Sequence, residues 1–211
     1  MKSAKVTATL AAVVALVLSS AIGASASGSA SSDAPPPEDT PDRIIYVDHP
    51  APLPVNKRVI SSNERGEAYV ADNTEFPIIP AEGETVQIVY TDAVTTVFTE
   101  PSTLPVQPAV CTVSMTVDAP TKAGNRPVVF GSAMVSRECS SGRGFTLGLY
   151  GANQERGRNA IPVPNSGNWW GIGTNGNICT YGFNSDYYGV GTISPDNRSV
   201  RGVTATLPCS F

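Results

Sequence analysis

Histidine is nearly absent from this chain, since His49 is the only one among 211 residues. Metal sites and catalytic centres that need two or more imidazoles are therefore excluded. His49 itself stands in a proline-rich stretch, which is a poor position for the base of a Ser-His-Asp centre. The four cysteines include no Cys-x-x-Cys pair. We therefore expect no metal and no cofactor, and we favour a protein that is not an enzyme.

Long apolar runs are also missing. The longest candidate, Leu10–Leu18, follows Lys2 and Lys5 and precedes the small residues Ala24-Ser25-Ala26. A membrane-spanning helix needs about 20 predominantly apolar residues. This pattern is instead typical of a cleaved signal peptide over residues 1–26. It predicts a secreted, extracellular protein with no membrane attachment after cleavage.

Charged residues make up only 15% of the chain, and they divide it at Cys111. Residues 27–110 hold 13 acidic and 4 basic side chains, whereas residues 111–211 hold 5 and 8. A coiled coil is excluded by this composition, and the basic half is too weakly charged for a nucleic-acid binder. We expect a disordered linker, an acidic accessory β segment or arm, a Pro-rich linker and a Cys-framed β domain, over residues 27–42, 43–99, 100–110 and 111–211.

Short β-like runs follow one another along the whole mature chain. In the acidic half they are residues 43–47, 59–60, 68–70 and 85–99, and nearby prolines limit the first three to edges or loops. In the second half they are residues 111–117, 127–139, 145–149 and 203–211, separated by turn signals. No segment of the second half has sustained helical periodicity. The pattern predicts an all-β fold, an antiparallel sandwich or small barrel preceded by an acidic Pro-rich arm.

Four cysteines in an exported chain favour structural disulfides. Three connectivities are possible. We prefer Cys111–Cys139 and Cys179–Cys209, because each pair is close in sequence and lies in phase on the inner faces of two predicted strands. Two disulfides would then hold the β domain together.

The most unusual stretch is residues 165–191, which is rich in Gly, Asn and aromatic residues. Trp169-Trp170 and Tyr187-Tyr188 are adjacent pairs, and adjacent side chains of a strand point to opposite faces. One member of each pair is therefore a candidate for an exposed, flat binding surface. Such a surface suits a cell-wall polysaccharide or an extracellular protein. The alternative interpretation is that these rings cover a thin core.

Two other function classes stay open. The first is a secreted inhibitor or antimicrobial protein, in which the acidic half is a pro-region that masks the basic half or is removed from it. The second is a carboxylate-based hydrolase, which needs two facing acids. Its candidates are Asp118, Glu138, Glu155, Asp186 and Asp196, which we expect on the solvated surface.

The second half carries one further pattern of spacing. It runs through Cys111, Val113, Val117, Pro120, Gly131, Cys139, Cys179, Tyr181-Gly182 and Cys209. This layout resembles that of small exported actinobacterial proteins with two Cys pairs. The resemblance implies a disulfide-pinned β-sandwich. It implies no functional residues, because most of these proteins have no assigned activity.

Overall fold

A computed structural model describes residues 34–64, 66–72, 76–100, 110–176 and 184–208, all within one unit, Ser32–Phe211. These residues form strands and loops with no helix among them, which confirms the all-β class. The strands are β1 Arg43–Tyr46, β2 Arg58–Asn63, β3 Gly66–Ala71, β4 Thr85–Val89, β5 Ala93–Glu100, β6 Cys111–Asp118, β7 Thr121–Ala123, β8 Arg126–Val135, β9 Arg143–Gly151, β10 Gln154–Val163, β11 Trp169–Asn175, β12 Asn184–Ser194, β13 Arg198–Arg201 and β14 Ala205–Pro208. The predicted signal peptide lies outside the described residues.

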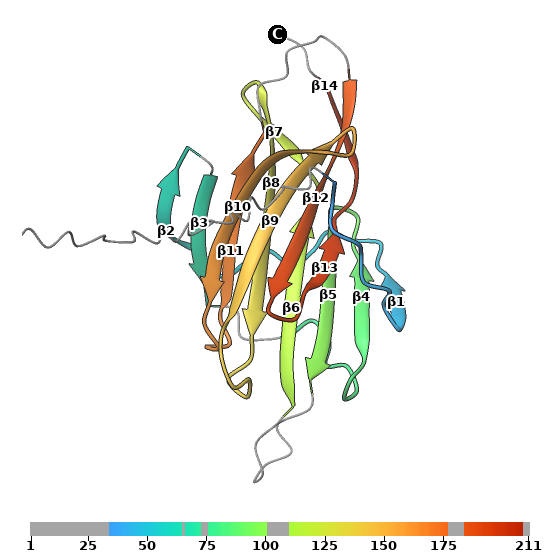
Figure 1. Ribbon diagram of the computed structural model, residues 1–211, viewed down its shortest axis with the longest axis vertical. Coiled ribbons are helices and arrows are strands. Elements are labelled where there is room, and N and C mark those ends of the chain that lie inside the picture. Colours follow the sequence, from blue (N-terminus) through green and yellow to red (C-terminus); the bar gives the residue numbers. More distant parts are fainter. Residues whose placement is uncertain (1–33, 65, 73–75, 101–109, 177–183, 209–211) are drawn as a thin grey trace, which may run out of the picture. The chain divides into compact units, whose positions relative to one another are not determined.

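The strands form two sheets (Figure 1). Sheet A has the order β1-β4-β5-β6-β8-β11-β3-β2, with β7 paired to β8. Sheet B has the order β10-β9-β12-β13, with β14 paired to β12. Neighbouring strands are antiparallel, as expected, except that β1 runs parallel to β4. The chain passes through β2 and β3 between these two strands, so no hairpin forces them into an antiparallel pair.

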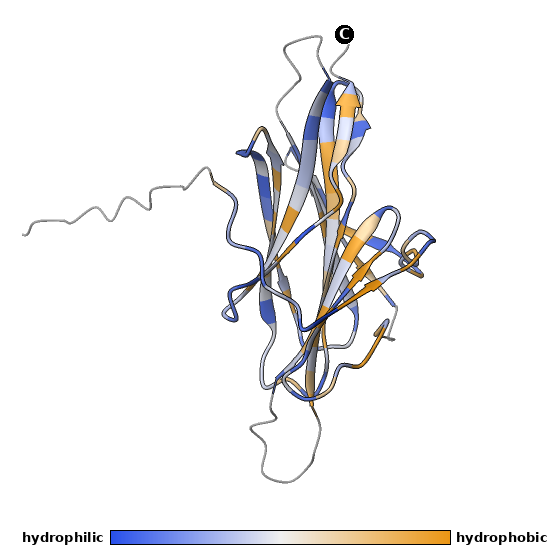
Figure 2. Ribbon diagram, turned by 90° about the vertical axis from the view of Figure 1, so that its right-hand side faces the viewer, coloured by the Kyte–Doolittle hydropathy of each residue, from blue (hydrophilic) through white to orange (hydrophobic). Residues whose placement is uncertain are grey.

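The two sheets pack against each other across the main apolar core. Val113, Met115 and Val117 of β6 contribute to it from sheet A, and Phe145 and Leu147 of β9 contribute from sheet B. The predicted alternation of β6 is confirmed, because these odd-numbered side chains all point inward. Figure 2 shows apolar and polar residues in bands along the strands.

The predicted run 85–99 is two strands rather than one. β4 and β5 form a hairpin in which Val89 pairs with Val94. The chain turns at Thr91-Asp92, where the backbone carbonyl of Asp92 accepts a hydrogen bond from Ala119 N at 2.6 Å. Sequence patterns missed this turn because it contains neither Gly nor Pro.

The expected boundary at Cys111 does not separate two structural parts. β5 pairs with β6 along its whole length, from Ala93 opposite Asp118 to Glu100 opposite Cys111. The acidic half supplies β1 to β5 of sheet A, so it is neither an accessory unit nor an arm. Alternating Val, Ile and Thr residues can fill a half-buried strand whatever the net charge of the segment around them.

Part of the expected disordered linker also has fixed contacts. Ser199 N of β13 donates a hydrogen bond to Asp39 Oδ2 at 3.0 Å, and Glu38 lies 3.6 Å from Arg201. Thr85 N of β4 donates to Asp42 Oδ2 at 2.8 Å. These carboxylates join a strand of sheet B to a strand of sheet A, and their hydrogen bonds explain why residues 38–42 are ordered despite their composition.

The Cys111–Cys139 disulfide is present, with a Cα–Cα distance of 4.5 Å. The predicted strand 127–139 is shorter than expected, because β8 ends at Val135. Cys139 therefore lies in a loop, where its backbone N donates to Ser136 O at 3.3 Å. Cys179 and Cys209 lie outside the described residues.

Candidate functional site

The outer face of sheet A, which points away from sheet B, is hollowed by a cavity of about 650 Å³. Even-numbered residues of β6 and β8 form its floor, because the odd-numbered ones fill the core between the sheets. Two irregular segments of the acidic half, around Ala51–Pro54 and Phe76-Pro77, line the cavity from above the sheet. We call this space the outer cavity.

Aromatic rings form much of its wall. The rings come from Tyr69, Phe76, Tyr90, Phe130 and Trp169. Two glycines of β11 make room for them: a Cβ at Gly171 would lie 2.1 Å from the Tyr69 ring, and one at Gly173 would lie 2.7 Å from the Phe130 ring. These two glycines of the 165–191 stretch thus leave room for rings on the floor of the cavity.

Polar groups lie among these rings. They are Lys57, Asp92, Thr95, Thr116, Asp118 and Ser132. The hydroxyls of Thr95 and Thr116 share a hydrogen bond of 2.8 Å between neighbouring strands. The cavity therefore combines flat apolar faces with hydroxyls, carboxylates and one ammonium, which is the composition of a site for a polar small ligand.

Asp118 is the most perturbed acid of the cavity. Burial, followed by the negative charge of Asp92, raises its pKa from 3.8 to about 6, while Lys57 acts in the opposite direction. No described residue donates a hydrogen bond to its carboxylate. Burial, together with the charge of Asp118, also raises the pKa of Tyr69 to about 12, so its hydroxyl stays protonated. A perturbed acid that lines a cavity is a candidate for a functional residue.

Lys57 lies across two of the rings. Its Nζ is 4.2 Å from the centre of the Tyr69 ring and 5.5 Å from that of Phe130. The same Nζ forms an ion pair of 3.1 Å with Glu67. The rings thus hold a cation by their faces, and that cation already has a carboxylate partner.

No protein-family model, no curated protein and no solved structure matches the chain. Within the described residues, no group of His, Cys, Asp and Glu could hold a metal ion. The described part of the chain also contains no helix long and apolar enough to cross a membrane.

The four aromatic residues predicted as a binding surface do not come together. Trp169 lines the outer cavity, whereas Trp170 packs on the core between the sheets. Tyr187 belongs to that same core, and Tyr188 stacks on Tyr150 on sheet B, with ring centres 5.6 Å apart.

The predicted exposure of these rings is wrong. Trp169 and Tyr187 are each 8% exposed, Tyr188 is 4% exposed, and Trp170 is half-buried. Each adjacent pair does divide between two faces, but none of the four rings is exposed. The large apolar side chains that are exposed among the described residues belong to the acidic half instead: Ile44, Tyr46, Leu53, Val55, Val59, Ile60 and Ile79.

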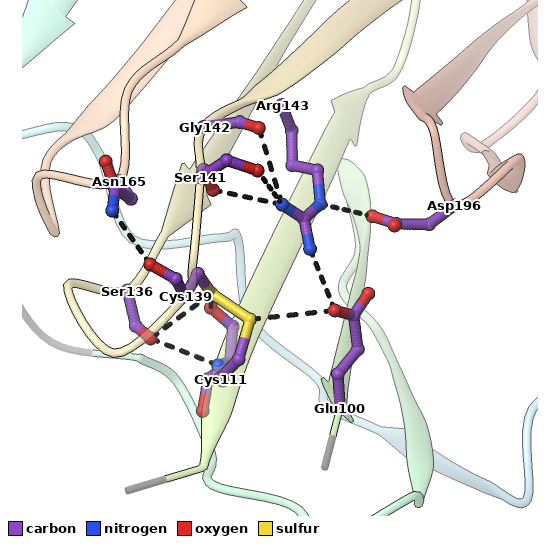
Figure 3. A network of polar contacts seen from close by, with 10 residues as sticks. Glu100, Cys111, Ser136, Cys139, Ser141, Gly142, Arg143, Asn165 and Asp196 are labelled. Atoms are coloured by element: carbon purple, nitrogen blue, oxygen red, sulfur yellow. Dashed lines mark hydrogen bonds and ion pairs between the residues drawn. A yellow bond between two sulfur atoms is a disulfide. The ribbon is translucent and has the colours of Figure 1, made fainter. Parts of the chain in front are cut away.

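A second cluster of acids surrounds Arg143, next to the disulfide (Figure 3). The guanidinium of Arg143 is nearly buried and contacts Glu100 Oε2 at 2.8 Å and Asp196 Oδ2 at 2.6 Å. Burial, followed by the charge of Asp196, raises the pKa of Glu100, and Arg143 opposes that rise. Hydrogen bonds to Ser141 O and Gly142 O satisfy further donors of Arg143, so all three nitrogens of its guanidinium are engaged within the protein.

The five acids proposed for hydrolysis do not form a facing pair in the outer cavity. Of these five, the cavity contains Asp118 alone, and its acidic neighbour is Asp92 from the other half of the chain. Asp196 pairs with Arg143, and Glu155 pairs with Arg158 at 2.5 Å. Sequence patterns missed Asp92, Tyr69, Tyr90 and Phe130, since nothing local shows that β3, β5 and β8 share one face.

Proposed function

We propose that the protein is a secreted, non-enzymatic binding protein that holds a carbohydrate in the outer cavity of sheet A. The main support is the combination of ring faces with polar groups in one cavity. Sugar rings stack on aromatic faces, and their hydroxyls exchange hydrogen bonds with carboxylates and with Ser and Thr hydroxyls. A volume of about 650 Å³ falls within the range of about 300–1,000 Å³ that is usual for small-ligand sites. A cell-wall polysaccharide is the natural ligand class for such a site on a secreted protein.

The site proposed from the structure is the outer cavity rather than the 165–191 surface, and among the described residues Trp169 is the one that belongs to both. Trp169 approaches the cavity from β11, while Asp92 and Thr95 approach it from the β4–β5 hairpin. The site therefore requires both halves of the chain.

We propose accordingly that the acidic half is retained in the mature protein, because its removal would take away β1 to β5 and the residues that cover the cavity. Mass spectrometry of the secreted product tests this, and a mature N-terminus between Pro101 and Cys111 would contradict it.

Retention on insoluble chitin, chitosan, cellulose and peptidoglycan tests the binding function. We expect at least one of these polymers to retain the protein, and Trp169→Leu to weaken the retention about tenfold through loss of ring stacking. Trp170→Leu is the matched control. It makes the same change, from Trp to Leu, at the next residue of the strand. Trp170 lines a different, smaller hollow of about 310 Å³.

A second variant separates binding from folding. Thr95→Val combined with Thr116→Val removes two hydroxyls from the cavity but keeps their shapes. Because both partners of one hydrogen bond are replaced by apolar groups of similar shape, the stability should change little. Weaker retention at an unchanged melting temperature supports the proposal. Equal retention of this variant, of Trp169→Leu and of the wild type would overturn it.

A further inference from the structure

We propose that the ligand of the outer cavity carries a positively charged amino group, and that Asp118 and Asp92 together form its counter-ion. The ligand class is then a glycan with unacetylated amino sugars. This inference rests on the proposed carbohydrate-binding function and goes beyond it, since it names the charge of the ligand and the groups that recognise it.

The two carboxylates lie at the same end of the sheet. Asp118 is the last residue of β6 and lies opposite Ala93, the first residue of β5, and Asp92 comes immediately before Ala93. The hydrogen bond from Ala119 N to the Asp92 carbonyl fixes the two chain segments side by side. Both carboxylates border the outer cavity.

Their hydrogen-bonding capacity is largely unused by the described residues. Asp92 Oδ1 accepts one bond, from Ala51 N at 2.7 Å, and none of the described residues donates a bond to the Asp118 carboxylate. An ionised carboxylate has about four acceptor sites on its two oxygens. A ligand that enters the cavity therefore meets acceptors without donors, and an ammonium group brings three donors.

The charged groups of the cavity also favour a cationic ligand, because negative charge is in excess. Among the described residues, Lys57 is the one cation that lines the cavity, and its Nζ lies 3.1 Å from Glu67. Two carboxylates therefore line the cavity against one ammonium, and the charge of Lys57 only partly offsets the effects of burial and of Asp92 on Asp118. A neutral sugar would leave this excess in place, whereas a cationic amine removes it.

The ring faces support the same conclusion. Lys57 shows that the faces of Tyr69 and Phe130 accept an ammonium group at 4.2 and 5.5 Å from their centres. The ammonium of Lys57 already has a carboxylate partner, since its Nζ lies 3.1 Å from Glu67 Oε1. An amino sugar could thus stack on the remaining rings while its amine faces the two aspartates.

Isothermal titration calorimetry with two tetrasaccharides tests the inference. One is the β-1,4-linked tetramer of glucosamine, and the other is its fully N-acetylated form, which has the same backbone without the charge. At about pH 7, above the Asp118 pKa of about 6, most of the Asp118 carboxylate is ionised. We expect the glucosamine tetramer to bind about 10- to 100-fold more tightly, as for a hydrogen bond between charged groups.

The variant Asp118→Asn should reduce this preference to a few-fold. Asp186→Asn is the control, because Asp186 is an exposed carboxylate of sheet B that accepts a hydrogen bond from Thr206 and lies outside the cavity. The preference should survive in the control. A preference that is unchanged in Asp118→Asn overturns the role of this residue as counter-ion.

The two proposals fail in different ways. Equal binding of both tetrasaccharides overturns the inference and leaves carbohydrate binding intact. Binding of neither tetrasaccharide, together with no retention on any of the four polymers, overturns the proposed function and the inference with it.

Discussion

Two pairs of acids in this fold have opposite surroundings. Glu100 and Asp196 share the buried guanidinium of Arg143. Asp92 and Asp118 border the outer cavity, and no cation of the described residues lies within ion-pair distance of either, although the charge of Lys57 acts on Asp118 from farther away. Acids that are matched by a cation and by hydrogen bonds hold a fold together, whereas an acid that is buried without an ion pair, such as Asp118, costs stability and is available to a ligand. This difference separates the structural cluster from the binding site.

Removal of Arg143 should have the largest effect on folding. Arg143→Met leaves two partly buried carboxylates close together without their cation, which should lower the free energy of unfolding by about 3–5 kcal/mol. The loss should shrink at about pH 4, since burial and the charge of Asp196 already raise the pKa of Glu100 and protonation removes the repulsion. Urea denaturation at both pH values measures this difference.

Arg137→Met is a suitable control for the loss of an arginine. Arg137 is exposed and its Nε donates one hydrogen bond, to Ser166 O at 3.0 Å. Its replacement should change the free energy of unfolding by less than about 1 kcal/mol. Equal losses in the two variants would show that the Arg143 cluster has no special part in stability.

The Cys111–Cys139 disulfide strengthens the same region. Replacing both cysteines by Ala should cost roughly 3–4 kcal/mol, because the bond closes a loop with a sequence separation of 28 residues in the unfolded chain. Denaturation under oxidising conditions measures the effect. Ser140→Ala, an exposed change in the same loop, should be neutral. A double variant as stable as the wild type would show that the cross-link constrains nothing that the sheets do not already hold.

The region around β6 and the disulfide could be predicted from the sequence, whereas the outer cavity could not. Alternation over residues 111–117 identifies β6 and its inner face correctly, because one strand suffices to show which residues share a face. The cysteine spacing likewise identifies the Cys111–Cys139 bond. The outer cavity needs β3, β5, β6, β8 and β11 in one order, and that order is set by pairings between distant segments. No pattern within a single segment of the sequence specifies that strand order.

The same limit explains the misplaced aromatic surface. Trp169 and Trp170 do alternate between faces, as expected, but loops of the acidic half cover the outer face where Trp169 lies. Burial by a distant segment cannot be read from the stretch that is buried. The prolines of residues 50–54 predicted a break between β-like runs, yet they gave no sign that this segment lines a cavity.

Asp118→Asn should stabilise the free protein at neutral pH. The folded pKa of about 6 lies above the ordinary 3.8, so the fold favours the protonated acid. Its stabilising contribution is complete below pH 3.8 and is lost as the pH rises through about 6. Because Asn does not titrate, the variant should exceed the wild type by about 1–2 kcal/mol at about pH 7.5 and match it at about pH 4.

Urea denaturation of the ligand-free protein measures that difference. Higher stability combined with weaker amine binding would show that Asp118 is kept for the ligand rather than for the fold. A variant that is less stable than the wild type at both pH values would instead mean that the carboxylate is already paired in the folded protein.

The smallest effect should come from an exposed ion pair. Glu38 and Arg201 lie 3.6 Å apart with side chains 52% and 39% exposed, and water screens such a pair strongly. Glu38→Gln should therefore change the free energy of unfolding by at most about 0.5 kcal/mol, and salt should remove even that. Asp39→Asn provides the contrast within the same segment, because Asp39 accepts a hydrogen bond from the backbone N of the buried Ser199. If Glu38→Gln proved as damaging as Asp39→Asn, net charge rather than specific hydrogen bonding would hold residues 38–42 on sheet B.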